Sequence, residues 1–132
     1  MYEKRGTYKS TYRGRQLLRF DGLELDSHIT PMDVDAMIEY HDQKRVLIEV
    51  KLQNTPVPQG ERLALERFVN DFGNLGKTSI AIIADHKVFD TKEDVLVRDC
   101  IVREIYHSDE RYWREPNRML RVSDLLNLFL YD

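Results

Sequence analysis

The chain has 132 residues and a formal net charge of −3, with 42% hydrophobic and 33% charged residues. This length fits one compact domain with its own core, and no segment approaches the roughly 20 apolar residues that a membrane-spanning helix needs. The single cysteine, Cys100, excludes an internal disulfide and a cysteine-ligated zinc site. We therefore expect a soluble, cytoplasmic protein with no membrane partner.

The charge is distributed unevenly along the chain. Residues 1–20 carry a local charge of +5, because they hold six basic residues against one acid, Glu3. Basic side chains contact phosphates, and the tyrosines between them can stack on bases. We interpret residues 1–16 as a basic arm that is either a nucleic-acid contact or a solvated terminus. Its candidate phosphate contacts are Lys4, Arg5, Lys9, Arg13 and Arg15.

In chain order, the first expected elements are short strands at 16–20 and 23–25, separated by a turn at Asp21-Gly22. Residues 34–40 and 45–52 then read as two strands rich in β-branched side chains. Only a short polar connection separates them, so they are expected to form a hairpin.

The next segment has helical periodicity. Leu65, Phe68, Val69 and Phe72 have the i, i+3, i+4, i+7 spacing of an apolar face, which predicts a helix over 61–72. Gly73 and Gly76 are its expected stop signals. The continuous apolar segment 78–85 is typical of a buried strand. The order strand, strand, helix, strand predicts an α/β fold with a central mixed β-sheet and flanking helices.

The C-terminal part predicts two more elements. Residues 94–106 are expected to form a strand in which Cys100 is a small buried hydrophobe. Residues 120–130 are expected to form a helix with Ser123 as its N-cap. We therefore expect a single domain over 1–132, with a core at 17–85 and a C-terminal extension at 86–132.

Three charged residues carry the chemical prediction. Glu49 and Lys51 lie two apart on a predicted strand, so both point to one face while apolar neighbours point to the other. The hairpin should fold Asp35 back beside Glu49. Two converging carboxylates are suitable ligands for Mg²⁺. Asp33 shares the face of Asp35 and is an alternative ligand, and a Glu-x-Lys pair can also be an ordinary solvated ion pair.

These residues resemble a known family. Pro31, Asp35 and Glu49-Val50-Lys51 are similar to the motif of the PD-(D/E)xK nuclease superfamily, which includes restriction endonucleases and Holliday-junction resolvases. The resemblance implies a restriction endonuclease-like core and Mg²⁺-dependent hydrolysis of DNA phosphodiesters, with Mn²⁺ able to substitute. It also implies that Asp35, Glu49 and the Val50 carbonyl are metal ligands and that Lys51 serves the attacking water.

The same resemblance implies a glutamine near the phosphate. Gln53, expected on the same strand face as Lys51, and Gln59, expected at the start of the helix, are the candidates. The chain departs from the family where Met32 separates Pro31 from Asp33. The family's acid-donating N-terminal helix is not evident either, and Glu24 or Asp26 is the substitute.

The resulting expectation is a small nuclease acting on DNA, structure-selective or non-specific, with a homodimer and a phage source as open possibilities. The alternative is a catalytically silent nuclease-like module that binds nucleic acid or protein. Intact Asp35, Glu49 and Lys51 favour the enzyme over this alternative.

Overall fold

The computed structural model describes residue 19, residues 21–23 and residues 31–131. Contacts within the chain divide it into two compact units, Met1–Met32 and Asp33–Asp132. In the first unit, the predicted turn at Asp21 and Gly22 is confirmed, and Gly22 has a φ of 85°. The basic arm at 1–16, the acids Glu24 and Asp26, and most of the strands expected at 16–20 and 23–25 lie outside the described residues.

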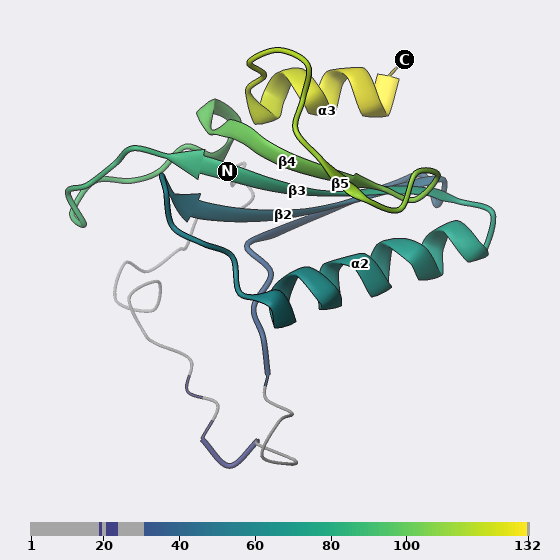
Figure 1. Ribbon diagram of the computed structural model, residues 1–132, viewed down its shortest axis with the longest axis horizontal. Coiled ribbons are helices and arrows are strands. Elements are labelled where there is room, and N and C mark those ends of the chain that lie inside the picture. Colours follow the sequence, from purple (N-terminus) through teal and green to yellow (C-terminus); the bar gives the residue numbers. More distant parts are fainter. Residues whose placement is uncertain (1–18, 20, 24–30, 132) are drawn as a thin grey trace, which may run out of the picture. The chain divides into compact units, whose positions relative to one another are not determined.

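The second unit is a mixed β-sheet with one helix on each face, as Figure 1 shows. The strands lie in the order β1 to β5, and only β2 and β3 are parallel neighbours. The predicted α/β class with a mixed sheet is therefore confirmed. The elements are β1 (Ala36–Tyr40), β2 (Lys44–Leu52), α2 (Gln59–Asn74), β3 (Thr78–His86), the 3₁₀ helix η1 (Val97–Asp99), β4 (Ile101–His107), β5 (Trp113–Arg114) and α3 (Val122–Tyr131).

The predicted hairpin is confirmed by the antiparallel pairing of β1 and β2, with Ala36 opposite Ile48. Left-handed backbone at His41 and Asp42, with φ of 49° and 59°, lets the chain reverse within a short turn. Because β1 begins at Ala36, Asp35 is the residue immediately before the strand.

Two apolar clusters hold the helices on the sheet. Below the sheet, Leu65 and Val69 of α2 pack on Leu47, Ala81 and Tyr106. Above it, Val122 and Leu130 of α3 belong to the larger cluster that includes Val46, Ile48, Ile80, Ile82, Val102 and Ile105. The central strand β3 is buried on both faces, which explains its unbroken apolar sequence.

The structure corrects two expectations for α2, which is longer than the predicted 61–72. Phe68 was expected on the buried face, but 55% of its surface is exposed. Gly73 does not stop the helix, since it lies inside α2, where an added Cβ would be 3.0 Å from Cβ of Ser108. Gly73 therefore permits close approach of the chain near Ser108. Gly76, with a φ of 81°, follows the end of the helix as expected.

The C-terminal part also needs corrections. The strand expected over 94–106 is wrong in its first half, where η1 precedes a shorter β4. Ser123 is not the N-cap, since α3 begins at Val122 and Asp124 accepts a 3.1 Å hydrogen bond from the Arg121 amide instead. The two-residue strand β5 escaped prediction because it is too short for any periodicity. Through β4 and β5, the segment 86–132 joins the same sheet as the predicted core.

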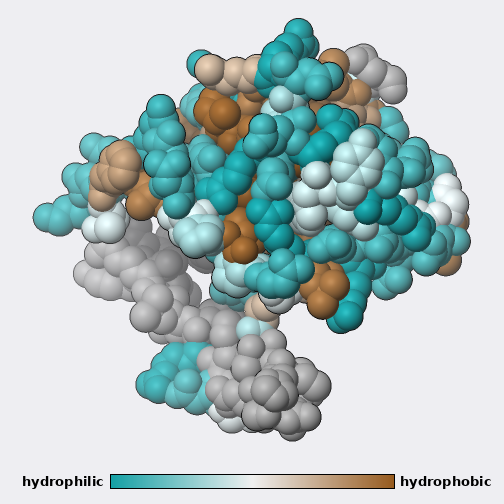
Figure 2. Space-filling model, in the orientation of Figure 1, coloured by the Kyte–Doolittle hydropathy of each residue, from teal (hydrophilic) through white to brown (hydrophobic). Residues whose placement is uncertain are grey.

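The outer surface agrees with the high charged fraction. The face in Figure 2 is largely hydrophilic, with apolar residues in small separate patches. Neither of the described helices is long and apolar enough to cross a bilayer.

Candidate active site

The hairpin brings Asp35 beside Glu49. The Val50 amide donates a 2.7 Å hydrogen bond to Oδ2 of Asp35, which holds this carboxylate against β2. The negative charge of Asp35 acts on Glu49, whose pKa it helps to raise. Asp33, the alternative ligand, is exposed and makes no hydrogen bond or ion pair with any described residue. Of the two aspartates, Asp35 is therefore the one that the fold brings to Glu49.

Glu49 is the buried acid of the site, with 7% of its surface exposed. Its side chain shares the α2 face of β2 with Leu47, as period-two alternation requires. Burial, followed by the negative charges of Asp35 and Glu61, raises the pKa of Glu49 from 4.5 to about 7, although Lys51 opposes the rise. Within the described part of the chain, Oε2 of Glu49 has no hydrogen-bond partner.

Lys51 lies between two carboxylates. Its Nζ is 3.7 Å from Oε1 of Glu49 and 3.1 Å from Oε2 of Glu61. Burial acts to lower the pKa of Lys51, but the carboxylates of Glu61, Glu49 and Asp35 outweigh it and the pKa rises. Lys51 is therefore a fixed cation at neutral pH.

Glu61 is the residue that the sequence reasoning missed. It lies in the first turn of α2, ten residues after Lys51, where a negative charge is also favourable for the helix. An acid at the start of a predicted helix was a visible signal. Whether the Glu61 side chain reaches Lys51, however, depends on how α2 packs under the sheet.

The two candidate glutamines do not join this group. Gln53 was expected on the strand face of Lys51, but β2 ends at Leu52 and the Gln53 amide donates to the His86 carbonyl at 2.8 Å. Gln53 therefore follows directly on β2, and its place on the face of Lys51 stays a prediction. Gln59 is the first residue of α2, as expected, and is exposed without a bond to the charged residues of the site.

A second group of charged residues lies on the neighbouring strands, with Asp85 on β3 and Arg103 and Glu104 on β4. Nε of Arg103 donates to Oδ1 of Asp85 at 2.8 Å, and its Nη1 donates to the Thr55 carbonyl at 2.7 Å. Asp85 is paired in register with Lys51. Glu104 is opposite Ile83 and Val102 is opposite Ala84, so Arg103 occupies a β-bulge. The bulge turns Arg103 toward the same side as Glu104, which forms an ion pair with Arg62.

The donor set fits a hard cation. The described residues contain no group of three or more histidine, cysteine, aspartate or glutamate side chains arranged as a ready-made metal cluster. Mg²⁺, however, is commonly held by one or two carboxylates together with water. Asp35 and Glu49 supply such a pair, and a cation there would relieve the repulsion that raises the pKa of Glu49.

Several histidine, cysteine and aromatic side chains elsewhere in the fold make local contacts. Nδ1 of His86 accepts a 3.1 Å hydrogen bond from the Val88 amide, and His41 lies in the hairpin turn. Cys100 is buried, as expected. Trp113 packs on Tyr106 with ring centroids 5.3 Å apart.

Comparison with known proteins adds no relative. No protein-family model matches this chain, no curated protein matches its sequence, and no solved structure matches it. The function must therefore be inferred from the geometry of the site.

Proposed function

We propose that the chain is a divalent-cation-dependent nuclease that hydrolyses phosphodiester bonds of DNA. One observation carries the proposal: Asp35, held by the Val50 amide, and the buried Glu49 converge beside the ammonium of Lys51. Burying a carboxylate on a sheet face is costly unless its charge is compensated. A bound cation would compensate it, so the arrangement is better explained by a functional site than by a stabilising surface ion pair.

In this proposal Asp35 and Glu49 hold Mg²⁺ or Mn²⁺, with the Val50 carbonyl as the third ligand that the family resemblance implies. When bound, the cation polarises the phosphoryl oxygen and lowers the pKa of a coordinated water. Lys51, a cation already fixed at 3.1 Å from Glu61, neutralises negative charge that develops on the phosphate during hydrolysis. The Val50 amide holds Asp35 in place for this task.

The topology supports the same proposal. The order hairpin, helix and parallel strand, with the acids on the hairpin, is what the resemblance to PD-(D/E)xK nucleases implies. We therefore propose a restriction endonuclease-like core. The basic residues expected to contact phosphates in the arm at 1–16 lie outside the described residues.

A cleavage assay tests this function. The full chain is incubated with labelled duplex, single-stranded and branched DNA, and with RNA, in Mg²⁺, Mn²⁺ or EDTA. We expect cleavage of DNA that EDTA abolishes and that Lys51→Ala reduces by about 100-fold or more. Lys92→Ala, which removes an exposed lysine away from these carboxylates, is the matched control and should cleave normally.

Two results would overturn the proposal. One is a folded protein that cleaves none of these substrates. The other is equal cleavage by the wild type and Lys51→Ala. Binding without any cleavage would favour the alternative of a silent nucleic-acid-binding module.

A further inference from the structure

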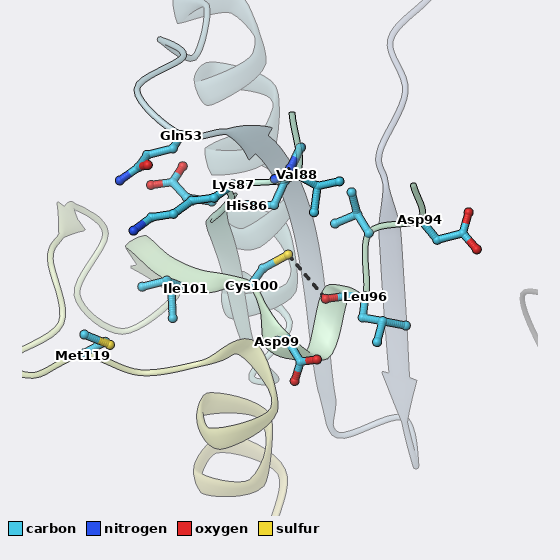
Figure 3. A pocket seen from close by; sticks show the side chains of 12 residues that line it. Gln53, His86, Lys87, Val88, Asp94, Leu96, Asp99, Cys100, Ile101 and Met119 are labelled. Atoms are coloured by element: carbon cyan, nitrogen blue, oxygen red, sulfur yellow. Dashed lines mark hydrogen bonds between the residues drawn. The ribbon is translucent and has the colours of Figure 1, made fainter. Parts of the chain in front are cut away.

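A cavity of about 680 Å³ opens where β2 and β3 end. Figure 3 shows that Gln53 and Lys87 extend over the end where Ile101 and Met119 lie, whereas Asp94 and Leu96 lie at the other end. The cavity volume falls in the range of small-ligand sites, about 300–1,000 Å³. Its lining residues are Gln53, Asp85, His86, Lys87, Val88, Asp94, Val95, Leu96, Asp99, Cys100, Ile101 and Met119.

The cavity adjoins the candidate active site. In the parallel pairing of β2 with β3, Lys51 is opposite Asp85 and Leu52 is opposite His86. Gln53, two residues after Lys51, already lines the cavity. A nucleic acid strand with its phosphate at Lys51 would therefore have a neighbouring nucleotide close to the cavity.

The walls favour a neutral group with polar edges. The side chains of Val95, Leu96, Ile101 and Met119 make much of the lining apolar. The Gln53 side-chain amide has both a donor and an acceptor. Because Nδ1 of His86 accepts a hydrogen bond from the Val88 amide, the neutral ring carries its hydrogen on Nε2 and can donate it.

The charges argue against an anion inside the cavity. Asp94 and Asp99 belong to its lining, and Asp85 is held by Arg103. Asp99 also lies 3.9 Å from Arg98 and from Arg121. Lys87 is the only lysine or arginine in the described lining, and in Figure 3 its side chain extends toward the Gln53 end and away from Asp94. A flat, uncharged heteroaromatic ring fits a lining with apolar walls, polar edges and three carboxylates against one lysine.

We propose that this cavity takes one unpaired nucleobase of the DNA strand, from a nucleotide next to the one held at Lys51. The proposal rests on the proposed nuclease function and adds how the substrate is selected. A base can enter such a cavity only from single-stranded DNA or after leaving the duplex stack. The protein should therefore prefer substrates with an unpaired nucleotide beside the cleaved bond.

The test measures binding of a fluorescein-labelled single-stranded oligonucleotide by anisotropy, in EDTA so that the oligonucleotide stays intact while Lys51 is retained. One abasic nucleotide is moved along the oligonucleotide, position by position. We expect one position to weaken binding by about 10-fold, because the abasic nucleotide there has no base to bury in the cavity. Leu96→Trp, which fills the cavity from an exposed position, should weaken binding of the intact oligonucleotide and remove the abasic effect.

Two further variants keep the result interpretable. Met119→Trp fills the cavity from another exposed lining position and should behave like Leu96→Trp. Leu75→Trp changes another exposed leucine, just after α2 and outside the cavity lining, and should retain the abasic effect.

Equal losses at every abasic position, or an abasic effect that persists in both filled variants, would overturn the cavity assignment. If the wild type still cleaves DNA in the assay above, the nuclease function stands without it. If the wild type neither cleaves nor binds nucleic acid, both proposals fail together.

Discussion

The ammonium of Lys51 on β2 lies 3.1 Å from the carboxylate of Glu61 in the first turn of α2. This ion pair joins β2 to the helix that packs beneath the sheet. The negative charge of Glu61 also lies near Glu49 and, together with burial and the charge of Asp35, raises the pKa of Glu49. Glu61 is therefore expected to set both the position of Lys51 and the charge balance of the site.

Replacing Glu61 tests that role. In Glu61→Gln we expect the pKa of Lys51 to fall, because a neighbouring negative charge is lost. We expect nuclease activity to fall by about 10-fold or more, because the ammonium is less well positioned. NMR titration of the Lys51 side chain measures the pKa, and initial rates measure the activity.

Asp71→Asn is the matched control, since it removes an exposed acid from the same helix. It should leave both the Lys51 titration and the cleavage rate unchanged. An unchanged Lys51 pKa in Glu61→Gln would contradict the ion pair.

Stability should depend on pH through Glu49. Its folded-state pKa of about 7 exceeds its ordinary value of 4.5. The stabilising contribution of this proton is therefore complete below about pH 4.5 and is lost as the pH rises through 7. In EDTA, we expect the melting temperature of the wild type to fall between pH 5 and 8 relative to Glu49→Gln, by ~5 °C. If the melting temperatures of the two proteins changed by the same amount between pH 5 and 8, the pKa of Glu49 would not be raised.

Cation binding should show the opposite pH dependence. A divalent cation at Asp35 and Glu49 must displace the proton that Glu49 retains. We therefore expect Mn²⁺ to bind more tightly at pH 8 than at pH 6 and to raise the melting temperature more at the higher pH. Calorimetry in two buffers of different ionisation enthalpy measures the released proton. A pH-independent affinity, or equal binding by Glu49→Gln, would refute the site.

The Arg103 contacts predict a structural effect. The guanidinium links β4 to Asp85 on β3 and to the Thr55 carbonyl in the loop before α2. Arg103→Met should destabilise the protein by about 2 kcal/mol, because it leaves a half-buried carboxylate and a carbonyl without their donor. Urea denaturation measures the free energy of unfolding. Arg98→Met, at an exposed ion pair 3.9 Å long, should change stability by less than about 0.5 kcal/mol.

The two glycines of α2 give a matched pair. Gly73→Ala places a Cβ 3.0 Å from Cβ of Ser108, so we expect a loss of about 1 kcal/mol despite the better helix propensity of alanine. Gly60→Ala meets no atom within 4 Å and should be neutral or stabilising by up to about 1 kcal/mol. Thermal melting of both variants checks the difference, and equal changes would contradict the close approach at Ser108.

The sequence by itself was sufficient for the hairpin and for the group formed by Asp35, Glu49 and Lys51. These relationships are local: strand alternation places Glu49 and Lys51 on one face, and a short turn brings Asp35 to Glu49. The same local rules failed for Phe68, which was expected on the buried face but is exposed, because the sheet covers only part of the apolar face of the helix.

Only the tertiary structure decided the rest of the site. Glu61 meets Lys51 because α2 packs on Leu47, Ala81 and Tyr106, which come from three different strands. Arg103 reaches Asp85 because a bulge in β4 changes the direction of its side chain. Contacts between distant segments depend on how whole elements pack, and no spacing within one segment encodes that packing.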